Sequence, residues 1–351
     1  MRLRTPRWWY VRTGAPMPMT RRLMTPISWV WAAVTARRIA RAQPFDAGLP
    51  VICVGNLTVG GTGKTPVVRT VARRLADKGL RVAVLTHGYG GRLKGPVRVD
   101  PAVHTAADVG DEALMLAREA SVWVSRDRPA GASAARRAGA EVVVMDDGHQ
   151  NPSLKKRLSL VVVDGETRDG EWPFGDGAVF PAGPMREPLA AGLARADAVV
   201  VLLPADLAAP DPALMALLAP KPALIARLTP AAQPPAGPQL GFAGIGKPWK
   251  MERALKAAGC DLVDFAPLPD HARYDARLLG FLARRAEALG AGLVTSEKDW
   301  VKLPPAWRER VTAWPVEARF EDEAALDRAL EAALQPGPSG PGSSRCALRP
   351  G

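Results

Sequence analysis

The sequence is poor in cysteine. Its 351 residues include only Cys53, Cys260 and Cys346, and none of them stands in a C-x-x-C pair. This scarcity excludes a disulfide framework and a cysteine-ligated zinc site, and it is typical of a chain that works in a reducing cytosol.

The first 50 residues contain almost no acid and no long apolar run. Asp46 is their one acidic residue against nine arginines, so most of the net charge of +12 lies there. Their longest uncharged run, 23–36, is shorter than the ~20 residues that span a bilayer. Because arginine mixed with tryptophan suits an anionic leaflet, we expect residues 1–48 to form a basic amphipathic segment on the cytoplasmic membrane surface. The alternatives are a signal peptide, or a basic helix that packs on its own domain or touches RNA.

The composition, 47% apolar and 23% charged, excludes a disordered chain and a multi-spanning membrane protein. A single core seldom grows beyond ~250 residues, so a chain of this length is expected to form two lobes with an active site between them. We expect a P-loop kinase domain over 49–220 and a second, smaller α/β lobe over 221–334. Residues 335–351, rich in Pro, Gly and Ser, are expected to be a disordered tail.

Short apolar runs alternate with amphipathic helices from residue 49 onward. A strand at 50–54, a glycine turn, a helix at 66–78 and a strand at 81–86 together form a βαβ unit. Such a unit makes a parallel sheet, so the expected fold class is α/β with a doubly wound parallel sheet. Further strands are expected at 141–145, 158–164, 197–203, 223–228, 240–245, 261–266, 292–296 and 311–314, and helices at 112–120, 126–138, 250–258 and 276–289.

The glycine turn, 55–65, is expected to bind ATP. Its backbone N–H groups and the positive end of the next helix would surround the phosphates, with Lys64 at the β and γ phosphates and the Thr65 hydroxyl on Mg²⁺. The loop departs from the pattern G-x-x-x-x-G-K-[ST], because Thr58 stands at its first glycine. The alternative is an ordinary glycine-rich turn with an exposed lysine. The predicted ATP-binding residues are Thr58, Val59, Gly60, Gly61, Thr62, Gly63, Lys64 and Thr65.

Acidic residues follow a second apolar strand. Asp146 and Asp147 end the run 142–147, where a nucleotide-binding fold holds Mg²⁺ from the strand next to the phosphate loop. A turn or capping role is the alternative for one of the two. Asp111 precedes a helix, and its position alone predicts an N-cap. His271 lies in a polar loop of the second lobe, from which a side chain would be able to reach across a cleft.

Taken together, these segments resemble the tetraacyldisaccharide 4'-kinase family, the lipid A 4'-kinases, over about residues 29–318. The matching stretches are 54–66, 88–91, 109–112, 146–150, 181–188, 269–271 and 295–299. The resemblance implies transfer of the γ-phosphate of ATP, with Mg²⁺, to the 4'-hydroxyl of a tetraacyldisaccharide 1-phosphate in lipid A biosynthesis. It also implies a lipid A disaccharide precursor as partner and the cytoplasmic face of the inner membrane as location.

By position, the resemblance implies that Asp111 is the catalytic aspartate and His271 its partner, in a dyad that takes the proton from the sugar hydroxyl. Lys64 completes the expected catalytic set. The sequence departs from the family at two places next to matching stretches. It has His87, before 88–91, where a basic residue is usual, and Ala272, after 269–271, where a second histidine is common.

Three further residues receive roles on the same basis. Glu187 is expected to add a carboxylate to the metal site formed by Thr65 and the two aspartates, and Arg128 or Arg186 is expected to hold a phosphate. The alternative for each of the three is a structural or surface ion pair.

Other classes fit the sequence less well. A P-loop kinase or ligase for a soluble acceptor leaves the arginine- and tryptophan-rich segment unexplained, and a nucleotide-gated switch lacks an N-K-x-D guanine-reading motif. Nucleic-acid binding is not expected, because the positive charge is concentrated at one end without a recognised RNA- or DNA-binding motif.

Overall fold

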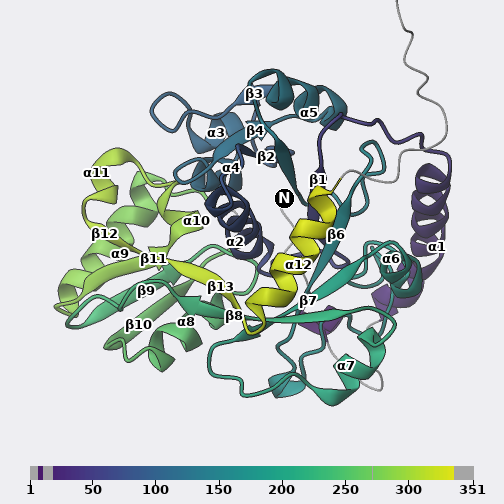
Figure 1. Ribbon diagram of the computed structural model, residues 1–351. Coiled ribbons are helices and arrows are strands. Elements are labelled where there is room, and N and C mark those ends of the chain that lie inside the picture. Colours follow the sequence, from purple (N-terminus) through teal and green to yellow (C-terminus); the bar gives the residue numbers. More distant parts are fainter. Residues whose placement is uncertain (1–6, 11–18, 271, 336–351) are drawn as a thin grey trace, which may run out of the picture.

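The protein contains a larger, mostly parallel sheet and a smaller parallel sheet (Figure 1). The computed structural model describes residues 7–10, 19–270 and 272–335. The larger sheet has nine strands in the order β13-β8-β7-β6-β1-β5-β2-β4-β3, and the smaller has four in the order β10-β9-β11-β12. The predicted α/β class with a doubly wound parallel sheet and a smaller second α/β layer is confirmed.

The larger sheet is parallel except at its two edges, where β3 and β13 run antiparallel to their neighbours. Its central strands are buried along their whole length, as expected where helices cover both faces of a sheet. The strands are β1 (Val51–Asn56), β2 (Val82–Thr86), β3 (Val97–Arg98), β4 (Ser121–Val124), β5 (Val142–Asp146), β6 (Leu158–Asp164), β7 (Ala198–Pro204), β8 (Ala223–Pro230) and β13 (Val316–Phe320).

Helices cover both faces of this sheet. On one face lie α2 (Lys64–Asp77), α4 (Asp111–Leu116) and α12 (Glu323–Leu334), and α3 (Ala106–Val109) directly precedes α4. On the other face lie α5 (Arg128–Arg137), α6 (Leu189–Ala194) and α7 (Pro212–Leu218). The buried face of α2 includes Val67, Val71 and Leu75, which the helical period predicts.

The smaller sheet is also parallel and is covered on both faces. Its strands are β9 (Gln239–Ala243), β10 (Leu262–Pro267), β11 (Gly292–Ser296) and β12 (Val311–Trp314). The helix α8 (Pro248–Ala257) packs on one face and α9 (Ala276–Ala288) on the other, while α10 (Glu297–Trp300) and α11 (Pro305–Arg308) connect β11 to β12.

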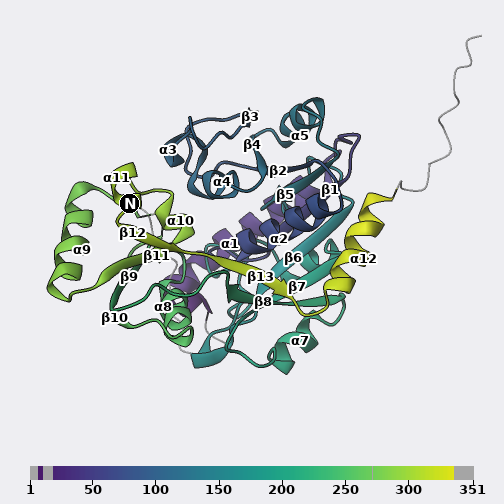
Figure 2. The same cartoon turned by 60° about the vertical axis from the view of Figure 1, so that its left-hand side comes forward.

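The expected division of the chain at residue 220 does not match the sheets. The strands β8 and β13 belong to the larger sheet and α12 packs on it, although their residues fall within the expected second lobe, 221–334. The chain leaves this sheet after β8, forms the second lobe, and returns through β13, which pairs with β8 from Val316↔Pro230 to Phe320↔Ala226. Figure 2 shows β13 running back from the second lobe to the larger sheet. The reason is long-range strand pairing, which composition along the chain does not encode.

The helix α1 (Met19–Ala40) lies at the edge of the molecule away from the second lobe (Figure 1). A short 3-10 helix, η1 (Arg7–Tyr10), precedes it, and a second, η2 (Arg168–Gly170), follows β6. None of the helices in the described part of the chain is long and apolar enough to cross a membrane. Residues 1–6, 11–18 and 336–351 lie outside the described residues, and so does most of the predicted disordered tail.

Candidate active site

The phosphate-binding loop connects β1 to α2 and is held by hydrogen bonds from the last residue of β1. Asn56, the last residue of β1, is buried and donates hydrogen bonds to the Thr58 carbonyl at 2.8 Å and the Thr62 hydroxyl at 3.1 Å. Gly63 has a φ of 78°, and a Cβ there would lie 2.3 Å from Cδ2 of Leu202. Both the left-handed backbone and the close approach of β7 therefore require glycine at this position.

All eight predicted ATP-binding residues, 58–65, lie in this loop and the first turn of α2. The helix begins at Lys64, so its unpaired N–H groups and the positive end of its dipole face the loop, as in anion-binding sites. The side chain of Lys64 is mostly buried, and its Nζ lies 3.7 Å from Oδ1 of Asp147. The turn therefore presents a cation and a hydroxyl side by side, as nucleotide phosphates with Mg²⁺ require.

Asp146 ends β5, next to the P-loop strand, and is almost completely buried. Burial, together with the charges of Glu112 and Asp147, raises the pKa of Asp146 to about 7. Its Oδ2 is buried without a hydrogen-bond partner among the residues that the structure describes. A buried carboxylate oxygen left free beside a phosphate loop is suited to a hard cation such as Mg²⁺.

Asp147 differs from its neighbour because two cations face it. Arg186 donates to both of its carboxylate oxygens, at 2.7 and 3.1 Å. Burial opposes ionisation of Asp147, but Lys64 and Arg186 hold the pKa of this carboxyl well below its usual range. The side chain therefore carries a negative charge that is already paired with protein groups.

Glu187, the fourth predicted metal residue, is likewise engaged. Both of its carboxylate oxygens accept from Nη2 of Arg195 at 2.6 Å, and Gln150 donates to one of them at 3.0 Å. Of the four predicted metal residues, Thr65 and Asp146 are therefore the two that fit direct contact with Mg²⁺. Two protein oxygens suffice, because Mg²⁺ at nucleotide sites takes its remaining ligands from phosphates and water. Within the described ranges, no group of three His, Cys, Asp or Glu side chains forms a metal site.

The two arginines predicted to hold a phosphate have different surroundings. Arg128 is buried and donates to the carbonyls of Leu85 at 2.9 Å and Asp146 at 3.0 Å, so it ties the ends of β2 and β5 together. Arg186 is partly exposed, and its Nε donates to the Thr58 carbonyl at 3.0 Å. The hydrogen bonds of Arg128 are structural but are made to backbone carbonyls, not in the ion pair expected as the alternative, whereas Arg186 lies between the P-loop and Asp147.

Asp111 is the first residue of α4 and is 6% exposed. The preceding Gly110 has a φ of 92°, and a Cβ there would lie 2.5 Å from the Tyr89 carbonyl, so the Gly88–Gly91 turn supports the start of this helix. The charges of Asp111 and of Asp270, in the second lobe, both act on the ammonium of Lys298. Asp270, the residue before the predicted His271, thus acts on the same ammonium as the start of α4, while His271 itself lies outside the described residues.

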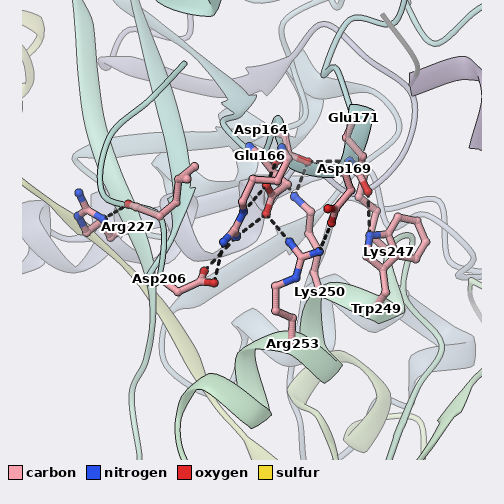
Figure 3. A network of polar contacts seen from close by, with 12 residues as sticks. Asp164, Glu166, Asp169, Glu171, Asp206, Arg227, Lys247, Trp249, Lys250 and Arg253 are labelled. Atoms are coloured by element: carbon pink, nitrogen blue, oxygen red, sulfur yellow. Dashed lines mark hydrogen bonds and ion pairs between the residues drawn. The ribbon is translucent and has the colours of Figure 1, made fainter. Parts of the chain in front are cut away.

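A network of charged groups joins the second lobe to the carboxyl edge of the larger sheet (Figure 3). Asp164, at the end of β6, accepts from Lys247 at 2.9 Å and from Lys250 at 2.6 Å. Lys247 also donates to Glu171 at 2.8 Å. Burial opposes the charge of Lys247, but Asp164 and Glu171 raise the pKa of this lysine well above its usual range. The network holds the start of α8 beside the P-loop.

The short helix η1, near the N-terminus, also contacts the P-loop and Lys247. The Tyr10 hydroxyl donates to the Val59 carbonyl of the P-loop, and Nζ of Lys247 lies 4.7 Å from the centre of the Tyr10 ring. Burial raises the pKa of Tyr10 to about 12, so its hydroxyl keeps its proton. The P-loop is therefore flanked by residues from three distant parts of the chain.

The sequence analysis assigned no role to Asn56, Lys247 or Lys298. Asn56 is the second residue of the glycine turn, where a polar side chain at the end of an apolar strand is a local signal. Lys298 belongs to the stretch 295–299 that carries the family resemblance, but its charged partner is 186 residues away. Nothing local marks Lys247, whose acidic partners lie in the other lobe.

A phosphate loop before a dipole-bearing helix, a free carboxylate on the next strand and a second lobe that contacts the same edge of the sheet are the features of a P-loop phosphotransferase. A family model described as "Tetraacyldisaccharide-1-P 4'-kinase" matches residues 20–335. The chain belongs to this family, as the sequence analysis predicts.

Individual relatives point to the same family. The chain is 73% identical over 327 residues to a tetraacyldisaccharide 4'-kinase of Phenylobacterium zucineum, with 93% of this chain and 98% of the relative covered. It is 68% identical over 331 residues to one of Caulobacter sp. strain K31, with 94% and 99% covered. A crystal structure of the "apo" form of LpxK from Aquifex aeolicus in complex with ATP aligns with a TM-score of 0.70 and 25% identity, covering 90% of this chain and all of that one.

These findings confirm the predicted enzyme class and its cofactors ATP and Mg²⁺. The chain is an ATP-dependent kinase of lipid A biosynthesis, and its family acts on a lipid A disaccharide precursor. The alternatives of a kinase or ligase for a soluble acceptor and of a nucleotide-gated switch are thereby set aside.

Proposed function

We propose that this chain transfers the γ-phosphate of ATP to the 4'-hydroxyl of a tetraacyldisaccharide 1-phosphate in the cleft between the P-loop and the second lobe. One observation carries the proposal. The start of α4, with Asp111 and Glu112, interacts with both sides of the site. The charge of Glu112 acts on Asp146 beside the P-loop, and Lys298 of the second lobe donates a hydrogen bond to Glu112. An acceptor hydroxyl held at Asp111 would therefore lie near the phosphate that it attacks.

The roles of the residues follow from the chemistry of phosphoryl transfer, which needs alignment and charge neutralisation more than covalent help. The N–H groups of residues 60–65 hold the β and γ phosphates, and Lys64 neutralises charge on the transferred group. Mg²⁺ held by Thr65 and Asp146 would supply further neutralisation and alignment of the phosphates. Arg186 pairs with Asp147 and fixes the position of the P-loop through its hydrogen bond to the Thr58 carbonyl.

Asp111 is the proposed acceptor of the proton that leaves the 4'-hydroxyl, either directly or through His271. Because Asp111 lies in the first lobe and His271 follows Asp270 of the second lobe in the sequence, the proposed pair would require the lobes to be docked. Docking also excludes water from the cleft, which limits hydrolysis of ATP without transfer.

The helix α1 is the proposed contact with the cytoplasmic face of the inner membrane, where the acylated substrate would reside. Five of its exposed apolar side chains recur every three to four residues and form one stripe along the helix, while Met24, Trp29 and Trp31 are exposed on other parts of its surface. Trp31 of this helix donates to the Arg186 carbonyl at 3.2 Å, so the stripe is coupled to a segment that braces the P-loop. The residues of the stripe are Met19, Leu23, Ile27, Val30 and Val34.

The catalytic proposal is tested by transfer of labelled γ-phosphate to a tetraacyldisaccharide 1-phosphate in detergent micelles. Lys64→Ala, Asp111→Ala and His271→Ala are compared with the wild type. Loss of a positioned base is expected to lower turnover by about 100-fold or more, with ATP affinity retained in the last two variants. ATP hydrolysis by the wild type without any labelled lipid would contradict the proposed acceptor.

The membrane proposal is tested by flotation with vesicles that contain anionic phospholipid. The double variant Leu23→Ser and Val34→Ser is expected to lose most of its vesicle binding. The matched control, Phe281→Ser with Leu289→Ser, removes equally apolar exposed residues from the second lobe and is expected to bind as the wild type does. Equal binding by both double variants would show that α1 is not the contact.

A further inference from the structure

The short helix α10 of the second lobe contacts two helices of the first lobe through consecutive residues. Glu297 accepts two hydrogen bonds from Arg69 of α2, at 2.9 and 3.1 Å. Lys298 donates to Glu112 of α4 at 3.0 Å. The helix α10 therefore touches both the helix that begins with the P-loop lysine and the helix that begins with Asp111.

The next residue anchors α10 within its own lobe. Asp299 is fully buried and accepts from the Gly244 amide at 2.9 Å and from the Ser296 hydroxyl at 2.7 Å. This anchoring fixes the direction in which Glu297 and Lys298 point, because a helix of four residues has little rigidity of its own.

Lys298 is charged in this setting although its side chain is largely buried. Burial opposes the charge, but Glu112, Asp111 and Asp270 raise the pKa of Lys298 well above its usual range. These three carboxylates come from both lobes and all favour the charged form of one ammonium, which Glu112 contacts directly at 3.0 Å.

We infer that Lys298 is a positioning residue for phosphoryl transfer, which holds the start of α4 through Glu112 so that Asp111 is placed for catalysis when the lobes are docked. This inference rests on the proposed function of Asp111. It assigns to the second lobe a direct part in building the acceptor side of the site, in addition to covering it.

Electrostatics explain why a cation is needed there. Asp111 and Glu112 are adjacent, and the charge of Glu112 already acts on Asp146. An ATP molecule would bring further negative charge to the same edge of the sheet, and like charges in a partly desolvated cleft repel strongly. Lys298 offsets this repulsion at α4, while Lys64 does so at the P-loop.

A second contact between the same two elements distinguishes positioning from simple docking. The Arg118 guanidinium, just beyond the C-terminal end of α4, lies 4.5 Å from the centre of the Trp300 ring at the end of α10. It joins the same elements but places no charge beside Asp111. If docking alone matters, loss of Arg118 and loss of Lys298 should have similar effects.

The test measures kcat, the KM for each substrate and the melting temperature for Lys298→Met, Lys298→Arg and the control Arg118→Met. A lost charge-assisted hydrogen bond corresponds to about 10- to 100-fold, and we expect this loss to fall on kcat in Lys298→Met. The KM for ATP should change by less than about threefold, because the P-loop is untouched. We expect Lys298→Arg to recover most of the turnover and Arg118→Met to retain it.

Glu112→Gln provides an independent check through a double-mutant cycle. If Lys298 acts through Glu112, the double variant loses no more turnover than Lys298→Met alone. Fully additive losses would overturn the inference, as would equal kcat in Lys298→Met and Arg118→Met. Neither result would affect the proposed function, which fails only if the wild type forms no phosphorylated lipid.

Discussion

Arg186 forms a bidentate ion pair with Asp147, at 2.7 and 3.1 Å, while its Nε donates to the Thr58 carbonyl at 3.0 Å. One side chain thus ties the phosphate loop to the turn after β5. This residue fixes the position of the phosphate loop relative to Asp147. Removal of its guanidinium should therefore mainly weaken the affinity for ATP.

We expect Arg186→Met to raise the KM for ATP by about 10-fold or more, because a charge-assisted contact of this kind contributes about 1.5–3 kcal/mol. Steady-state kinetics at saturating lipid measure the change. Arg227→Met is the matched control, since Arg227 also joins a carboxylate, Glu321, to the backbone carbonyl of Leu207, but outside the cleft. A KM for ATP that rises equally in both variants would contradict this role of Arg186.

Gly63→Ala is expected to abolish ATP binding in a folded protein. The new Cβ would meet Leu202 at 2.3 Å and would also force an alanine into a left-handed backbone conformation. Gly79→Ala separates the two effects, because Gly79 has a φ of 83° but a Cβ added there would meet no atom within 4 Å. Calorimetric titration with ATP should show no binding for Gly63→Ala and near-normal binding for Gly79→Ala. Normal binding by Gly63→Ala would show that the loop tolerates the displacement of Leu202.

Stability should fall as the pH is lowered from about 6.5 to 4, in part because of His149. This side chain is buried between the Ser159 hydroxyl at 3.0 Å and the Gly192 carbonyl at 2.9 Å. Burial, with the charges of Arg195 and Lys156, lowers its pKa from 6.5 to about 4. Between these values the unfolded chain binds the proton and the folded chain does not, so protonation favours unfolding.

The expected loss from His149 reaches about 3 kcal/mol at the acid end of that window. Urea unfolding at several pH values measures it. His149→Gln should be less stable than the wild type near pH 7 but should lose less stability on acidification. An unchanged pH slope in His149→Gln would show that His149 does not carry the effect.

The central part of the fold and the nucleotide loop could be predicted because their signals are local. The β1-turn-α2 unit combines an apolar strand, a glycine turn and a helical period within 27 residues, from Val51 to Asp77. By contrast, β8 and β13 are paired across 85 residues that form the second lobe. That pairing depends on the return of the chain, and the division expected at residue 220 followed composition instead.

The same distinction applies to the site. Lys64 and Thr65 are marked by their place at the start of the helix that follows β1, and Asp146 by its place at the end of the neighbouring strand β5. The carboxyl ends of parallel strands meet at the same edge of a sheet, so these side chains are expected to lie close together. The surroundings of Arg128 and Glu187 are set by carbonyls and cations that only the folded chain brings near them. Residue type and position therefore predict the edge of the sheet at which these side chains gather, but they do not specify which charged groups are already paired.

The most direct test of the central claim is the position at which the acceptor receives phosphate. Labelled γ-phosphate of ATP is offered with Mg²⁺ to the tetraacyldisaccharide 1-phosphate and, in parallel, to an analogue that lacks only the 4'-hydroxyl. We predict labelled lipid in the first reaction and none in the second. Equal labelling of both acceptors would contradict the account, because the phosphate would then be transferred to a different group.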